Sequence, residues 1–124
     1  MDRWHLPSID QAGKREPRVL FSSSACRAVV IDLQAGETMG EHSVHENAIV
    51  QVATGVVAIA TDGPEAECPA GSLVVFEPGE RHALRAVEPS RLLLLLAPWP
   101  GDGHYQAGEV ERLAANARVP PLAS

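Results

Sequence analysis

Aromatic residues and positive charge are both scarce in this 124-residue sequence. Phenylalanine, tryptophan and tyrosine make up 4% of it, and the formal net charge is −6. Single-stranded nucleic acids are bound by exposed aromatic rings in basic grooves, and a phosphate backbone is repelled by net negative charge. We therefore expect no nucleic-acid partner.

Long apolar runs are also missing, and cysteine is rare. The longest run, Leu92–Ala97, is far shorter than the about 20 apolar residues that cross a bilayer, so we expect no membrane partner. The opening residues, MDRWHLPSID, contain no apolar stretch typical of a secretory signal. Cys26 and Cys68 are too few for a disulfide framework and are interpreted as small buried hydrophobes. These features favour a soluble cytoplasmic protein.

Short β-prone runs separated by turn residues are what the sequence does contain. Its length and its hydrophobic fraction of 45% suit one domain with a core. The runs are separated by Gly, Pro and Asp, and no alternation of strands with helices is visible. This pattern predicts an all-β antiparallel sandwich or small barrel. The predicted strands are Arg18–Phe21, Cys26–Leu33, His42–Thr54, Val56–Thr61, Glu65–Cys68, Leu73–Phe76, His82–Val87 and Arg91–Ala97.

These strands are predicted to form a barrel over residues 18–98, between two terminal segments. Residues 1–17 are interpreted as an irregular arm with one short edge strand around Trp4–Leu6. Residues 99–124 form a C-terminal tail, in which apolar residues on one helical face predict a helix over Gln106–Ala117. The closing residues, PPLAS, are expected to be disordered.

Two stretches that each combine a glycine turn, a β-rich run and a histidine are the candidate functional segments. They are Gly36–Gly55, GETMGEHSVHENAIVQVATG, and Gly71–His82, GSLVVFEPGERH, and they hold three of the five histidines. We interpret Gly36–Gly40 as a loop and expect both stretches to face one small cavity. A helix over His42–Ala53 is the alternative there, but the β-branched residues of that run favour a strand.

These stretches resemble the two motifs of the cupin superfamily, whose members are double-stranded β-helix (jelly-roll) barrels. The first motif is G-x5-H-x-H-x3–4-E-x6-G, and the second is G-x5-P-x-G-x2-H-x3-N. The resemblance covers about Arg18–Pro98 and implies a cupin-type barrel, although Glu77 replaces the second motif's proline and Ala86 its asparagine. The residues that stand in register with the motifs are Gly36, His42, Gly55, Gly71, Gly79 and His82.

The resemblance implies a metal site that this sequence retains in part. In metal-binding cupins the ligands are two histidines and the glutamate of the first motif, together with the histidine of the second. His42 and His82 match these positions, whereas Val44 and Ala48 fall on the other two. A divalent metal with open coordination positions usually needs about three protein ligands. The strict register therefore predicts weak metal binding in an apolar interior.

Strand alternation predicts which side chains share the cavity with these histidines. Successive side chains of a strand point to opposite faces, so Val44 lies on the face of His42. Ala48 and Val50 continue that face across a turn. On the strand that begins at His82, every second side chain points to the same side as that histidine, so Leu84 shares its face. The predicted pocket residues are therefore His42, Val44, Ala48, Val50, His82 and Leu84.

One extra residue in the strand would change this prediction. A β-bulge at Ser43 or Val44 reverses the alternation beyond it and would bring His45 beside His42. His42, His45 and His82 would then form a three-histidine site for a divalent transition metal. Zinc, iron, manganese and nickel all suit such a site, and the sequence does not choose among them.

Charged residues next to the second motif have two interpretations. Glu77 and Glu80 flank a Pro-Gly turn and are expected to be exposed rather than to act as an acid–base pair. Arg81 and Arg85 could neutralise these carboxylates, or one of them could point into the pocket and hold an anionic substrate. Arg85 lies three residues after His82, so the two face opposite sides of a strand, which disfavours Arg85 as a pocket cation.

Three functions of different classes follow from these residues and the resemblance. The first is binding of a small-molecule ligand in an apolar barrel, with His42 and His82 as polar contacts and no tightly held metal. The second is a metal-dependent enzyme of dioxygenase, isomerase or decarboxylase type, with its metal on His42, His45 and His82. The third is a metal-free, epimerase-like enzyme with a histidine base, which the missing paired acid disfavours. Family likeness and open edge strands imply a homodimer.

Overall fold

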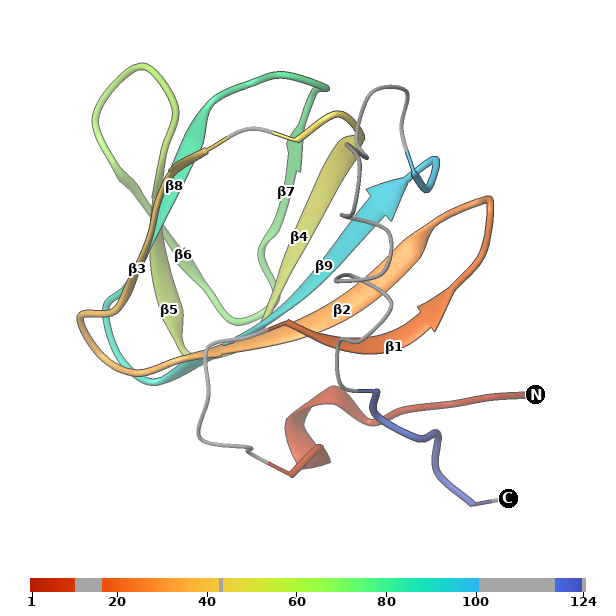
Figure 1. Ribbon diagram of the computed structural model, residues 1–124. Helices are drawn as coiled ribbons and strands as arrows, with labels where there is room; N and C mark the ends of the chain where they lie inside the picture. The colour runs from red at the N-terminus through yellow and green to blue at the C-terminus, as the bar shows by residue number, and fades with distance from the viewer. Residues whose placement is uncertain (11–16, 43, 101–117, 124) are drawn as a thin grey trace.

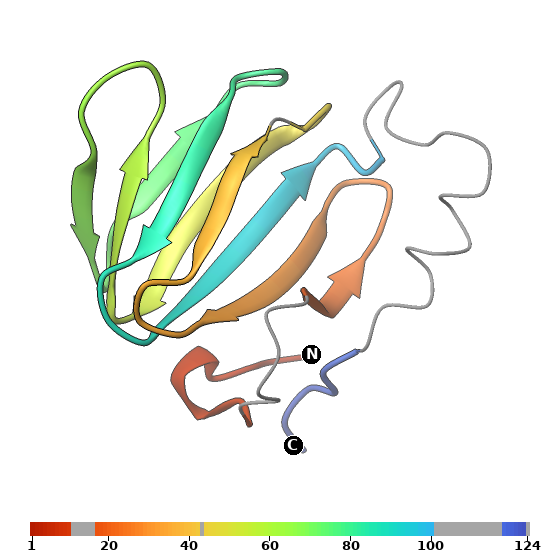
Figure 2. The ribbon, with the colours of Figure 1, turned by 60° about the vertical axis from the view of Figure 1, so that its left-hand side comes forward.

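Two antiparallel sheets face each other and enclose the core (Figures 1 and 2). The computed structural model describes residues 1–10, 17–42, 44–100 and 118–123. The five-stranded sheet has the order β1-β2-β9-β4-β7, and the four-stranded sheet has the order β3-β8-β5-β6. The 3₁₀ turn and the strands are η1 (Leu6–Ser8), β1 (Arg18–Ser22), β2 (Arg27–Leu33), β3 (Thr38–His42), β4 (Asn47–Thr54), β5 (Val56–Ala60), β6 (Ala66–Pro69), β7 (Leu73–Phe76), β8 (His82–Ala86) and β9 (Ser90–Ala97).

The middle of the five-stranded sheet is formed by two long, mainly apolar strands, β2 and β9. Every residue of β2 is buried, because one face of the strand enters the barrel and the other lies beneath the terminal segments. β9 lies between β2 and β4 and is paired with both. In β4, burial follows the strand period of two: Ala48, Val50 and Val52 are buried, and their neighbours are less so. The inward side chains form one core cluster.

The outer face of the same sheet carries a buried ion network centred on Asp32. Its carboxylate accepts hydrogen bonds from Arg18 (Nη2 to Oδ2, 2.7 Å) and from Arg91 (Nε to Oδ1, 2.6 Å). Arg91 also donates from Nη1 to the carbonyl oxygens of Leu6 and Ile9, at 2.7 and 2.6 Å. Buried charges are tolerated when they are paired and hydrogen-bonded. The network therefore fastens the N-terminal arm to the sheet.

The two terminal segments lie side by side below this outer face, as Figures 1 and 2 both show. The amide of Val119 donates to the Val19 carbonyl, and the amide of Leu122 donates to the Arg3 carbonyl, both at 2.8 Å. The Trp4 indole Nε1 donates to the Val119 carbonyl at 3.1 Å. Beneath the segments lies a second apolar cluster, composed of Trp4, Leu6, Ile9, Leu20, Ala28, Val30, Leu93, Leu95 and Val119.

The turn between β4 and β5 depends on Gly55, the last glycine of the first motif. Its φ is +83°, a left-handed conformation that other L residues rarely adopt. A Cβ at this position would collide with the Ser90 hydroxyl and the Pro89 carbonyl oxygen. The Ser90 hydroxyl accepts a hydrogen bond from the Val56 amide at 3.1 Å. Glycine is therefore required both by the backbone and by the close approach of the turn before β9.

The all-β fold predicted from the sequence is confirmed, and three local strand predictions are wrong. The strand predicted over His42–Thr54 is interrupted, because residues 44–46 lie outside both β3 and β4. Trp4–Leu6 does not form a strand, because η1 begins at Leu6 with Pro7 in its first turn. Thr38–His42 is strand β3, although its first residues were expected in a loop. Glycine and charged side chains hide this strand from the sequence pattern, whereas its backbone pairs with β8.

Predictions for the C-terminal tail have mixed outcomes. The disorder expected for the closing residues is wrong for Leu122, whose amide is hydrogen-bonded to Arg3. The helix predicted over Gln106–Ala117 lies outside the described residues. Within the part of the chain that the structure describes, no helix is long and apolar enough to cross a membrane.

Candidate functional site

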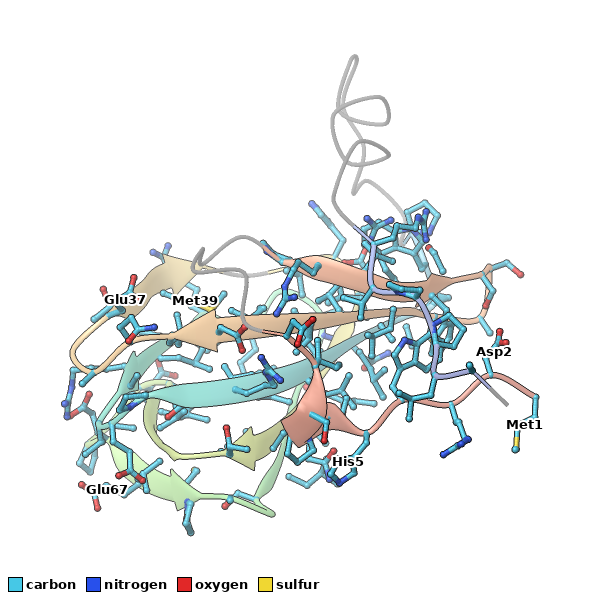
Figure 3. The ribbon with its side chains drawn as sticks, turned by 90° about the horizontal axis from the view of Figure 1, so that it is seen from below. Met1, Asp2, His5, Glu37, Met39 and Glu67 are labelled. Carbon is cyan, nitrogen blue, oxygen red and sulfur yellow. The ribbon has the colours of Figure 1, made fainter. Side chains whose placement is uncertain are left out.

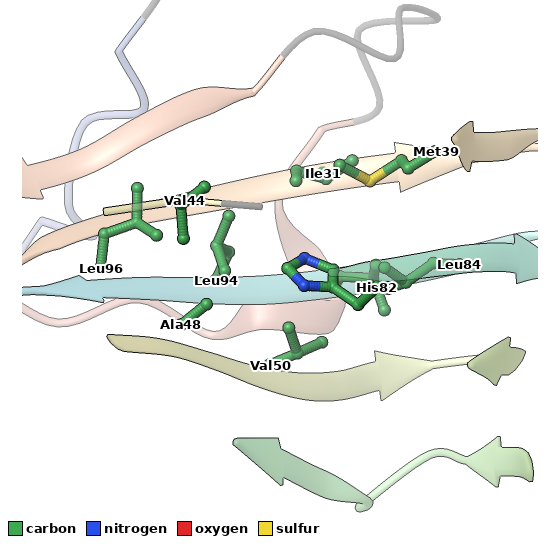
Figure 4. Close-up of a pocket in the computed structure, with 10 residues that line it drawn as sticks. Ile31, Met39, Val44, Ala48, Val50, His82, Leu84, Leu94 and Leu96 are labelled. Carbon is green, nitrogen blue, oxygen red and sulfur yellow. The ribbon is translucent and has the colours of Figure 1, made fainter. Parts of the chain in front are cut away.

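A cavity lies between the two sheets, with one histidine among apolar side chains (Figure 4). Its free volume is about 20 Å³, which is room for about one water molecule. Five of the six predicted pocket residues line it, and they come from β4, β8 and the loop before β4. The described lining residues are Ile31, Met39, Val44, Ala48, Val50, His82, Leu84, Leu92, Leu94 and Leu96.

His82 is held in a fixed orientation at the start of β8. It is 4% exposed, and its ring stacks on the buried ring of Phe76 with centroids 3.9 Å apart and an interplanar angle of 9°. Its Nδ1 lies 3.0 Å from the carbonyl oxygen of Glu80. A carbonyl oxygen can only accept, so Nδ1 carries the proton and, in the neutral ring, Nε2 is an acceptor. Figure 4 shows the ring extending into the middle of the lining.

His42 is placed beside His82 by the backbone register. The two residues are Cα partners where β3 pairs with β8, and directly opposite residues of an antiparallel pair point to the same side of the sheet. The side chain of His42 lies outside the described part of the structure, as does Ser43. The register shifts between Met39 and His42, so an irregularity exists in β3, before the position where we considered a bulge.

His45 is exposed and is not among the described residues that line the cavity. Val44 is partly buried and lines the cavity, and its carbonyl oxygen accepts from the Gly79 amide at 2.8 Å. Ala48, at the family's glutamate position, is a buried wall residue. Among the described residues, no three His, Cys, Asp or Glu side chains come together as metal ligands. The described donors therefore do not fit a metal that needs three protein ligands.

Several lining residues fall outside the predicted pocket, as does Phe76, which supports His82. The leucine run of β9 has no alternation from which an inward face could be read. A usable indication was nevertheless present, because Asp32 and Arg91 each interrupt an apolar strand. Placing these charges outward would have turned Ile31 and Leu92 inward, where the structure has them.

Arg85 faces away from the cavity and pairs with Glu65. Its Nη2 lies 3.0 Å from Oε1 and its Nε lies 3.3 Å from Oε2, on the exposed side of the four-stranded sheet. The hydrogen bond from Arg85 lowers the pKa of Glu65, and the same contact raises the pKa of Arg85. Glu80 instead accepts from the Glu77 amide at 3.0 Å within its own turn. The interpretations of Arg85 as partner of Glu77 and Glu80 or as pocket cation are therefore wrong.

Comparison with known proteins identifies the family. The sequence model of the Cupin domain matches residues 29–97, which is more than half of the chain and includes both motifs. This chain belongs to the cupin family. No curated protein matches its sequence.

Solved structures of other proteins share the cupin fold. A conserved protein of unknown function from Streptococcus pyogenes is 28% identical, with a TM-score of 0.62 over 70% of this chain and 76% of that one. An RmlC-like cupin from Desulfovibrio desulfuricans is 21% identical, with a TM-score of 0.70, and the match covers 79% of this chain and 97% of that one. KdgF from Halomonas sp. is 20% identical, with a TM-score of 0.64, and the match covers 69% of this chain and 80% of that one. The last two likenesses show the fold alone.

Proposed function

We propose that this cupin binds a small, largely apolar molecule in its barrel cavity, with His82 as a polar contact. The observation that carries the proposal is one oriented, buried imidazole within a described lining that is otherwise apolar. Ligand pockets typically combine an apolar wall with a few placed polar groups. His42 is proposed as a second contact, because the register sets it opposite His82.

The size of the cavity limits how such a ligand enters. Room for about one water molecule means that wall side chains must move to admit a larger molecule. Met39 is suited to this movement, because methionine is unbranched and fills irregular space in several rotamers. It lies opposite Leu84 in the register of β3 and β8, at the edge of the smaller sheet. We therefore propose that Met39 is the adaptable wall of the site.

A metal-dependent enzyme is the second candidate, and one observation favours it. Metal-binding histidines usually donate their other ring nitrogen to a carboxylate or a backbone carbonyl. His82 does so toward Glu80, which leaves Nε2 as the atom that would bind a metal. Among the described residues, His82 has no second and third ligand beside it for a metal that needs three protein ligands. The metal-free, epimerase-like alternative has less support, because the described lining offers His82 no carboxylate or tyrosine as a paired acid.

Calorimetry with a matched pair of probes tests the first proposal. Cyclohexanol can donate a hydrogen bond to the imidazole, whereas cyclohexane cannot. We expect His82→Phe, which keeps a ring against Phe76, to weaken cyclohexanol binding about tenfold and to leave cyclohexane binding unchanged. His45→Phe, at an exposed histidine, is the control. The proposal fails if neither probe binds the wild-type protein, or if His82→Phe binds both as the wild type does.

Elemental analysis of protein purified without chelators separates the second candidate from the first. Stoichiometric metal that is lost in both His82→Ala and His45→Ala would establish the three-histidine site and favour the enzyme. If metal is lost in His82→Ala but retained in His45→Ala, the protein has a metal site of which His45 is not a ligand. If the protein stays free of metal after dialysis against zinc, iron, manganese and nickel, the metal-dependent enzyme is excluded.

A further inference from the structure

A second cavity, larger than the one in the barrel, lies between the two terminal segments. Its volume is about 270 Å³, compared with about 20 Å³ in the barrel. This is close to the lower end of the range for small-ligand pockets, about 300 Å³, so the groove has room for a compact molecule. The walls come from the arm around Trp4 and His5, from Arg18, and from residues 118–122. Figure 3, a view from below, shows His5 on the side of the molecule where the terminal segments lie, in front of the strands.

Positive charge predominates in the groove, although the whole chain has a net charge of −6. Arg118 is exposed, and its guanidinium makes no hydrogen bond or ion pair with any described residue. Arg18 is engaged with Asp32 and with the Asp10 carbonyl oxygen, and Asp32 is shared with Arg91. The network of Arg18, Arg91 and Asp32 therefore carries two positive charges and one negative charge. Asp10 is the acidic side chain of the described lining and offsets part of this excess.

Another part of the lining is apolar. The Trp4 ring is fixed by the hydrogen bond from Nε1 to Val119, and it stacks on Phe21 with centroids 6.2 Å apart and an interplanar angle of 27°. Leu122 and Pro120 continue this wall. A fixed aromatic surface next to an arginine suits a ligand with an anionic end and a flat or apolar body.

We propose that this groove binds a small organic monocarboxylate. Arg118 pairs with the carboxylate, and the body of the ligand lies against Trp4. A guanidinium presents a planar fork of donors that matches the two oxygens of a carboxylate, and a single such fork suits one negative charge. Because the groove is shared by both terminal segments, the ligand also joins the arm to residues 118–122. The site is separate from the barrel cavity and does not depend on the function proposed there.

Sodium benzoate is the probe for a calorimetric test, with benzyl alcohol as its neutral counterpart. We expect benzoate to bind the wild-type protein in the millimolar range and benzyl alcohol to bind more weakly. Arg118→Gln should weaken benzoate about tenfold. Arg85→Gln removes an exposed arginine outside the groove and is the matched control. His82→Phe should also leave benzoate unchanged, because His82 lines the other cavity.

Hydrogen exchange provides a second readout. Benzoate should slow exchange at the amides of Val119 and Leu122, which bond to β1 and to the arm, and should leave Val50 in the barrel unaffected. The proposal is overturned if benzoate does not bind, if Arg118→Gln binds it as the wild type does, or if benzyl alcohol binds equally well. Protection that appears at Val50 instead of Val119 would likewise overturn it.

Discussion

Both faces of the five-stranded sheet carry an apolar cluster, but among the described residues only the outer face adds a network of charged side chains. The inner face packs apolar side chains around one imidazole, and its cavity has room for about one water molecule. The outer face holds three charged side chains in a buried network and is covered by the two terminal segments. Most of the inner face falls within residues 29–97, which match the family, whereas β1, with the core residue Val19, and the covering segments lie outside that match. The family match thus covers most of the barrel, and the segments that cover its outer face come from the two ends of this chain.

Removing the charge at the centre of the outer face should have the largest effect on stability. In Asp32→Asn, the buried guanidinium of Arg91 and the partly buried guanidinium of Arg18 would lose their carboxylate. Breaking a buried pair in this way costs about 3–5 kcal/mol. Urea denaturation should show the loss, and Asp62→Asn, at an exposed aspartate, is the control. Equal denaturation midpoints for the two variants would mean that the network does not stabilise the outer face.

Neighbouring leucines of β9 allow the two apolar layers to be compared directly. Leu92 is 1% exposed and faces the barrel core, whereas Leu93 faces the outer cluster and is partly exposed. Leu92→Ala should cost about 2–5 kcal/mol in free energy of unfolding, because it leaves a cavity in a closed core. Leu93→Ala should cost less, since the terminal segments can close over the gap. An equal or larger loss for Leu93→Ala in denaturant titrations would contradict the idea that the inner layer is the more tightly packed.

The ion pair between Arg85 and Glu65 should have the smallest effect, because it lies outside both layers. The pKa of Glu65 is lowered in the folded protein by the hydrogen bond from Arg85. Its contribution is therefore present above the ordinary glutamate pKa and is lost as the pH falls through the lowered value. Both partners are exposed, so Glu65→Gln should change Tm little at neutral pH and not at all at about pH 2. A difference in Tm that grows in acid would contradict this sign.

Much of the fold could be predicted from sequence because β-branched runs, turns and four motif glycines all indicate the same strands. β7 begins and ends at the predicted residues, Leu73–Phe76. β3 could not be predicted from the sequence, because Thr38–His42 includes a glycine and polar residues. It is a strand because its backbone pairs with β8. The path of the terminal segments rests on contacts between residues far apart in the chain, such as Arg91 with Leu6, which local patterns do not encode.

The candidate site was predictable to the extent that strand alternation applies. Alternation places Val44, Ala48 and Val50 on one face, and the structure brings them together with His82 around one cavity. The side-chain position of His42 is outside the described structure, so the polar contact expected from it stays a prediction. The homodimer also stays a prediction, and light scattering in solution would test it.

The position of β9 in the larger sheet has a consequence for how the chain folds. The strand is the last of the barrel to be synthesised, yet it lies between β2 and β4 and completes the pairing of both. Until it inserts, β2 and β4 each present an unpaired edge, which is a template for association with other chains. Proteins dominated by such distant pairings fold slowly, in milliseconds to seconds. During translation, the sheet without β9 therefore exposes two strand edges that the finished sheet covers, and this is the stage at which we expect aggregation.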